Sequence, residues 1–210
     1  MNKGKIIVVE GTSNVGKTSL CKSCELCDQF VVIQEAIRYL ENRIKLSQNE
    51  IMAIPNNIEV ELLNQELLFD IEFEKLFDAN IFCKKEKTVI IDKSIFAIMA
   101  TAYAFEKYKN FKGAFRNSLV LYRKYMDKAK RFGLKLPDKY FLLSVNRKEF
   151  EKRNLQRNHI LDGEWVDNMI IEKQNKALNS CMKFSSSTLH MIDTSGKTKE
   201  EVMSEFKASL

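Results

Sequence analysis

A segment near the start of the chain combines residue types that can hold phosphate. Residues 11–18 read Gly-Thr-Ser-Asn-Val-Gly-Lys-Thr and fit the pattern Gly-x4-Gly-Lys-Thr. The glycines let the backbone curl so that successive N–H groups point at one anion. Lys17 can reach the β- and γ-phosphates, and the Thr18 hydroxyl can bind Mg2+. The pattern predicts an ATP site with contacts from Gly11, Thr12, Ser13, Asn14, Val15, Gly16, Lys17, Thr18 and Ser19.

The same segment stands between a predicted strand and a predicted helix, which is the context that its chemistry requires. Residues 5–10 are mostly apolar and β-branched, as in a strand that is buried on both faces. Residues 19–26 can continue as a helix, whose N-terminus adds partial positive charge. We therefore interpret residues 11–18 as a phosphate-binding loop (P-loop) rather than a chance match.

Apolar, β-branched runs recur along the chain and alternate with helical patterns. The later runs are residues 30–33, 88–91, 140–145 and 188–192. Apolar residues at helical spacing predict helices at 56–82, long or broken, and at 95–108 and 114–132. This order predicts a five-stranded parallel sheet with helices on both faces, the three-layer α/β fold of P-loop NTPases, as one domain over 1–210 with a small lid around 153–166.

In such a fold the ligand lies at the carboxyl ends of the strands, so residues just past each run are candidates for the site. Glu35 and Arg38 follow the second run. Glu35 could accept the proton of an acceptor hydroxyl, and Arg38 could hold a phosphate. The alternative is that Glu35 complements a helix dipole while Arg38 is solvated.

Asp92 ends the third run and is followed by Lys93. A hydrophobic strand that ends in an acid is typical of the carboxylate that supports Mg2+ through its water shell. Lys93 stands where a water-activating NTPase commonly has a base, which favours transfer to a bound acceptor over hydrolysis. In the alternative, Asp92 only caps the next helix.

Two arginines follow the fourth run. Arg153 and Arg157 are spaced i, i+4 on a helix predicted at 147–158 and therefore share one face. Together they could neutralise charge on the γ-phosphoryl group, with 159–165 as a lid. The alternative is a solvated surface helix. Past the fifth run, the turn at 192–196 could contact adenine through its backbone.

Taken together, these residues resemble the P-loop nucleoside and nucleotide kinases, which include the deoxynucleoside kinases and thymidylate kinase. The resemblance implies that Glu35 is the general base and that Arg153 and Arg157 lead into the lid. Asp92-Lys93-Ser94 is similar to the family's Asp/Glu-Arg-Ser/Tyr motif, but Lys93 lacks the fork of an arginine. By position, Asn64 and Gln65 are candidates for reading a base.

Composition sets further expectations. The net charge of +6 is spread along 210 residues and suits nucleotide phosphates. Cys21, Cys24 and Cys27 are spaced like metal ligands, but on a helix this spacing stacks small side chains along one stripe, so we interpret them as core residues. The sequence has no apolar run of about 18 residues and no signal-peptide pattern, which favours a cytoplasmic protein without a membrane partner.

These features predict an enzyme, a phosphotransferase that uses ATP and Mg2+ and acts on a nucleoside or nucleoside monophosphate. Lys17, Glu35, Arg153 and Arg157 are the candidate catalytic residues, while Glu35, Arg38, Gln65 and Lys93 would contact the acceptor and Thr18 and Asp92 the metal. The alternatives are a regulatory NTPase, a kinase for another small molecule, and a kinase for nucleic-acid 5′ ends. The helices predicted at 95–108 and 114–132 could form a homodimer interface or a monomer core.

Overall fold

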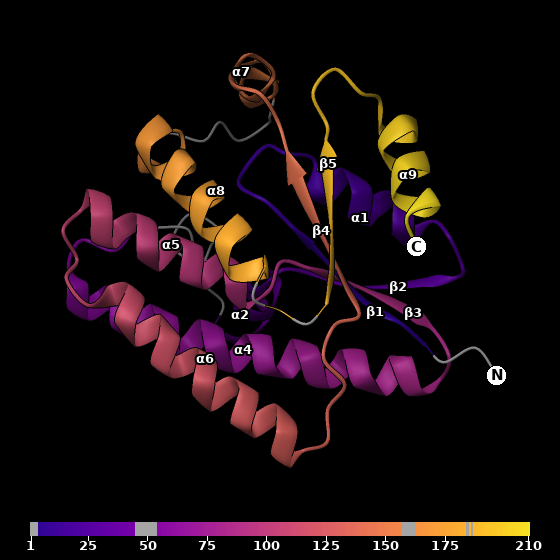
Figure 1. Cartoon of the computed structure of the whole chain (residues 1–210), viewed down its shortest axis with the longest axis horizontal. Coiled ribbons are helices and arrows are strands. Elements are labelled where there is room, and N and C mark those ends of the chain that lie inside the picture. The colour runs from indigo at the N-terminus through magenta and orange to yellow at the C-terminus, as the bar shows by residue number, and fades with distance from the viewer. Residues whose placement is uncertain (1–3, 45–53, 157–162, 184, 186) are drawn as a thin grey trace.

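The computed structural model describes residues 4–44, 54–156, 163–183, 185 and 187–210. Its centre is a five-stranded sheet in the order β2-β3-β1-β4-β5, and all four neighbouring pairs are parallel (Figure 1). The strands are β1 (Ile6–Glu10), β2 (Phe30–Ile33), β3 (Thr88–Asp92), β4 (Lys139–Ser144) and β5 (Thr188–Asp193). The predicted parallel α/β fold is confirmed, and each strand lies within two residues of its expected bounds.

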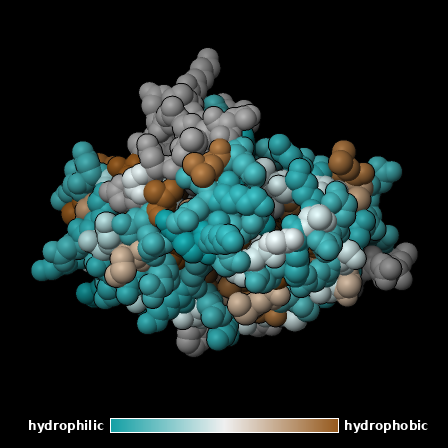
Figure 2. All heavy atoms as spheres, turned by 90° about the horizontal axis from the view of Figure 1, so that it is seen from above, coloured by the Kyte–Doolittle hydropathy of each residue, from teal (hydrophilic) through white to brown (hydrophobic). Residues whose placement is uncertain are grey.

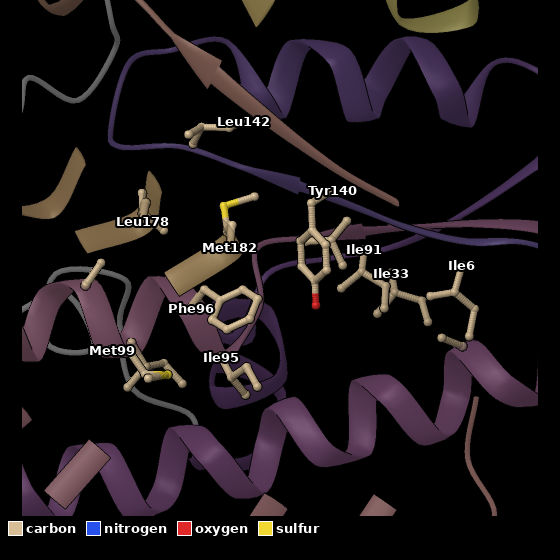
Figure 3. Close-up of a cluster of buried hydrophobic side chains, with 14 of the residues drawn as sticks. Ile6, Ile33, Ile91, Ile95, Phe96, Met99, Tyr140, Leu142, Leu178 and Met182 are labelled. Atoms are coloured by element: carbon tan, nitrogen blue, oxygen red, sulfur yellow. The ribbon is translucent and has the colours of Figure 1, made fainter. Parts of the chain in front are cut away.

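Helices cover both faces of the sheet because the side chains of β1 alternate between two cores. Ile7 and Val9 pack in one core with α1 (Lys17–Glu25) and α9 (Lys199–Ala208). Ile6 and Val8 pack in the other core, shown in part in Figure 3. This second core is covered by α4 (Ile58–Lys84), α5 (Ile95–Tyr108) and α8 (Asn168–Lys183). The result is the predicted three-layer arrangement.

The remaining described helices lie outside these layers or at the edge of the site. The helix α6 (Ala114–Arg131) packs on α4 and α5, and α2 (Ala36–Ile44) packs on α4. The helix α7 (Arg147–Leu155) follows β4, and a short 3-10 helix (Gly163–Trp165) precedes α8. Residues 157–162 of the expected lid, including Arg157, lie outside the described residues.

Helices α4 and α8 show which elements the spacing of apolar residues predicts and which it misses. The region 56–82, expected as one long or broken helix, is a single 27-residue helix, and the Asn57 side chain caps it by accepting a bond from the Val60 N–H at 2.9 Å. The helix α8 was not predicted as a separate element. Its apolar face is sparse, since the buried residues are only Ile170, Ala177, Leu178 and Met182.

Two of the three cysteines near α1 are core residues, as interpreted, and the third lies at the edge of the core. Cys21 and Cys24 are buried on α1, where burial raises the pKa of both thiols, while Cys27 is half-buried and packs against the same core. Seen from above, mostly hydrophilic residues cover the visible surface (Figure 2). Within the described ranges, no helix is both long and apolar enough to cross a bilayer.

Candidate active site

The P-loop connects β1 to α1 and is curled as the sequence predicts. Gly11 and Gly16 have φ of 141° and 100°, and Asn14 between them has φ of 60°. A Cβ at Gly11 would lie 2.5 Å from the Leu143 carbonyl oxygen, so the close approach of β4 permits only glycine. The loop therefore forms a tight backbone cradle ahead of the helix N-terminus.

Lys17 lies across this loop. Its side chain is 7% exposed, and its ammonium donates to the carbonyls of Gly11 at 2.8 Å and Thr12 at 2.7 Å. Burial, followed by the positive charge of Lys93, lowers the pKa of Lys17 to about 8. A buried cation whose hydrogen bonds go to neutral carbonyls gains strongly from an anion that accepts them. The position of Lys17 thus suits a phosphate ligand.

Asp92 lies next to the P-loop because β1 and β3 are parallel neighbours with Val9 opposite Asp92. Its side chain is buried, and among the described residues its Oδ1 atom has no hydrogen-bond partner. Burial raises the pKa of Asp92, while the charge of Lys17 opposes this shift. An orphaned carboxylate oxygen at this point fits a hydrated Mg2+, with the exposed Thr18 hydroxyl as the second candidate ligand.

The alternative role for Asp92, as a helix cap, does not describe the structure. Ser94 is the N-cap of α5, and its hydroxyl accepts a bond from the Phe96 N–H at 3.3 Å. Ser94 is in turn held by Glu10, whose Oε1 accepts bonds from the Ser94 N–H at 2.7 Å and the Ser94 hydroxyl at 2.6 Å. Burial raises the pKa of Glu10 to about 7. Sequence reasoning treated Glu10 only as the end of a strand.

Glu35 and Lys93 form an ion pair at the ends of β2 and β3, with 2.7 Å between Oε2 and Nζ. The charge of Lys93 lowers the pKa of Glu35 to about 2. Burial alone would lower the pKa of Lys93, but the carboxylates of Glu35 and Asp92 outweigh it and raise that pKa. Both groups are therefore ionised at neutral pH, and Glu35 in this arrangement is a weak base.

The arginines differ in position. Arg38, on α2, is half-exposed, and its Nη1 lies 2.6 Å from Glu41 Oε2. Arg153 instead touches the P-loop, with Nη1 donating to the Asn14 carbonyl at 3.2 Å. The same guanidinium donates to the Thr194 hydroxyl at 2.9 Å and carbonyl at 2.6 Å. Arg153 thus joins the P-loop to the turn that follows β5.

A cavity of about 230 Å³ opens from the P-loop between α2, α4, α5 and α8. Its wall includes Gly11, Thr12 and Ser13 at one end and passes Glu35 and Lys93. Three of its lining residues are carboxylates, namely Glu35, Glu61 and Glu72. Its apolar part includes the aromatic residues Phe105 and Trp165. The shape and the polarity suit a small ring compound with a few polar groups.

A buried hydrogen-bonded set on α4 and α6 borders the cavity. Gln65, 1% exposed, donates from Nε2 to Glu61 Oε1 at 2.7 Å and accepts at Oε1 from Asn117 Nδ2 at 3.0 Å. Burial raises the pKa of Glu61 to about 7. Asn64 and Gln65, both predicted by position, line the cavity. Glu61 and Asn117 were missed because neither belongs to a recognisable motif.

Comparisons with known proteins agree with this geometry at the level of the fold. No protein-family model matches the chain, and no curated protein matches it in sequence. Among solved structures, thymidylate kinase from Candida albicans superposes with a TM-score of 0.70 over 99% of this chain and 91% of that one, at 16% identity. The chain therefore has the P-loop α/β fold of a nucleotide kinase, as the resemblance in its motifs implied.

Proposed function

We propose that this protein is an ATP- and Mg2+-dependent phosphotransferase that moves the γ-phosphoryl group of ATP to a nucleoside or nucleoside monophosphate. The observation that carries the proposal is the continuity of one cavity. It is lined by the P-loop at Gly11 to Ser13, by the Glu35–Lys93 pair and by Gln65. A triphosphate on the loop and an acceptor in the cavity would share one space, which is the proximity that transfer needs.

At the phosphate end, the loop amides and Lys17 would bind the triphosphate. Lys17 would exchange its bonds to the Gly11 and Thr12 carbonyls for phosphate oxygens, a stronger, charge-assisted interaction. Thr18 and Asp92 are the residues that would hold Mg2+, which when bound neutralises the developing charge on the phosphoryl group. Arg153 would keep the loop against the turn after β5, and Arg157 is predicted to approach the γ-phosphate.

At the acceptor end, Glu35 would hold and orient a hydroxyl. A pKa of about 2 makes Glu35 a weak base, yet phosphoryl transfer with a loose transition state depends mainly on positioning and charge. Lys93 would share its charge between Glu35 and the group in transit. These roles of Glu35 and Lys93 do not require a base beside Asp92 that activates water.

Between the two acceptor types, the charges in the cavity favour a nucleoside. On the cavity wall Glu35 is held ionised by its pairing with Lys93. A second phosphate group would add negative charge beside Glu35 and would have to compete with it for Lys93. We therefore expect an uncharged nucleoside with a free hydroxyl to be the better acceptor.

A panel of nucleosides and nucleoside monophosphates, incubated with ATP and Mg2+, tests this proposal through the mass of the products. We expect one added phosphate on at least one nucleoside and slower reaction of its monophosphate. The Lys17→Ala variant should form product about 10³-fold more slowly, while Lys22→Ala, which changes an exposed lysine on α1, should match the wild type. Nucleotide hydrolysis without any phosphorylated acceptor would overturn the proposal in favour of an NTPase.

A further inference from the structure

A charged side chain lies fully buried beneath the site and belongs to none of the motifs. Lys75, in the middle of α4, is 0% exposed, and Glu72 one turn earlier is 5% exposed. Burying an ammonium is costly unless it is paired and all its donors are satisfied. An apolar residue would fill the same space without that cost. Packing alone therefore does not explain why a lysine stands at this position.

The hydrogen bonds that the Lys75 ammonium donates explain why a lysine stands at this position. Its Nζ atom donates to Glu72 Oε1 at 2.7 Å, to the Asp92 carbonyl at 2.9 Å and to the Lys93 carbonyl at 3.1 Å. An ammonium group has three N–H donors, so all of them are used. Two of the three go to the backbone where β3 ends, and Glu72 supplies the countercharge.

The backbone that Lys75 holds is strained and is pinned from the other side as well. Lys93 has φ of 60°, a left-handed conformation that side chains other than glycine adopt rarely. Its N–H donates to the Val9 carbonyl at 3.0 Å, and the next residue, Ser94, is bound by Glu10. Lys75 completes this support on the carbonyl side. Without it, two carbonyls would lose their buried donor.

The turn carries two residues of the proposed reaction. The Asp92 carboxylate lies beside Lys17, and the Lys93 ammonium lies on Glu35. Rotation of the peptide groups at 92 and 93 would move both side chains at once. We propose that Lys75 is a positioning residue for the phosphotransfer, holding the Asp92 and Lys93 carbonyls so that the Asp92 carboxylate stays beside Lys17 and the Lys93 ammonium stays on Glu35. This inference rests on the proposed function.

Two variants test the proposal, and an exposed lysine on the same helix supplies the control. Lys75→Met keeps the length of the side chain and removes its donors, but it leaves Glu72 buried without its cation. The double variant Glu72→Leu/Lys75→Met removes both charges, an exchange that folded proteins often tolerate. Lys84→Met, near the end of α4, is the control because Lys84 is exposed.

We expect kcat to fall about 10- to 100-fold in both variants, because displaced reacting groups cost rate steeply. The KM for ATP should change by less than about threefold, since the P-loop itself is untouched. A crystal structure of the double variant should show the turn at 92–93 rotated and the Lys93–Glu35 pair broken. Lys84→Met should behave as the wild type in every measurement.

Three outcomes would overturn the inference: a folded double variant with wild-type kcat, an unmoved turn, or a loss that falls wholly on the KM for ATP. Failure of the proposed function would show itself in a different measurement, made on the wild-type protein. If the wild-type protein phosphorylates no acceptor, the phosphotransferase proposal fails. The crystal structures would still decide whether Lys75 holds the turn.

Discussion

The two ends of the cavity are built in different ways. The proposed phosphate end is one continuous segment, residues 11–18, in which backbone amides shaped by Gly11 and Gly16 would be the main binding groups. The acceptor end is assembled from side chains on α2, α4, α5 and α8, together with Trp165. The first end would bind the triphosphate tail that all nucleoside triphosphates share. The second can vary without disturbing the first, so it is where the choice of acceptor is expected to reside.

The largest expected effect is at the phosphate end. Replacing Lys17 by alanine should reduce kcat/KM about 10³-fold, because a charge aimed at the transferring phosphate is lost. Steady-state kinetics with the best acceptor of the panel would measure this loss. Circular dichroism should show an unchanged fold. Activity within tenfold of the wild type would refute the role of Lys17.

Gly11→Ala tests the shape of the P-loop backbone while leaving the charge of Lys17 in place. A Cβ would meet the Leu143 carbonyl at 2.5 Å, so the loop must shift, and binding of ATP should weaken about 10²-fold with a loss of roughly 2 kcal/mol in stability. Isothermal calorimetry and urea unfolding give the two quantities. Gly133→Ala is the matched control, because Gly133 also has positive φ but no atom within 4 Å of the added Cβ. Equal effects in both variants would contradict the argument from crowding.

Glu35→Gln tests the acceptor end with the phosphate end intact. It should lower kcat about 10²-fold, since the carboxylate that orients the hydroxyl becomes an amide. The KM for ATP should stay close to the wild-type value, as measured by steady-state kinetics. Glu41→Gln, which alters the carboxylate paired with Arg38, is the control and should retain activity. A Glu35→Gln enzyme with an unchanged kcat would remove Glu35 from the reaction.

Glu61 bears on stability rather than on the reaction itself, and its effect depends on pH. Its pKa is about 7 in the folded protein against an ordinary value of 4.5, so the folded state holds a proton that the unfolded state releases between these values. Stability should therefore fall as pH rises from about 4.5 to 7, by up to about 3 kcal/mol. Glu61→Gln should flatten this slope in urea unfolding at several pH values. A slope equal to that of the wild type would show that Glu61 is not protonated in the fold.

Much of the fold could be predicted from the sequence because its signals are local. Buried parallel strands are short continuous apolar runs, and their neighbours in the chain are helical. The same logic located Glu35 and Asp92, since residues past parallel strands meet at one edge of the sheet. The helix α8 escaped notice because residues 172–176, Glu-Lys-Gln-Asn-Lys, interrupt its apolar spacing.

The partners of side chains could not be predicted in the same way. Arg38 and Arg153 were both expected at the phosphates from their spacing, yet Arg38 pairs with Glu41 while Arg153 contacts Asn14 and Thr194. Helical spacing indicates which residues lie on the same face of a helix, but it does not indicate what that face contacts. A signal for Lys75 was available, since it falls on the buried face of α4 with Ile71 and Ala79, but charge there has no meaning until a partner is known.

By itself, the sequence determined the P-loop, the five strands in chain order with most of the helices between them, and the carboxylates at the ends of β2 and β3. These features depend on backbone conformation and on burial pattern, which residues close together in the sequence determine. Only the tertiary structure decided that Lys75 bonds the β3 turn and that Glu61, Gln65 and Asn117 meet beside the cavity. Hydrogen bonds between side chains act over about 3 Å. They therefore depend on how helices distant in the chain pack together.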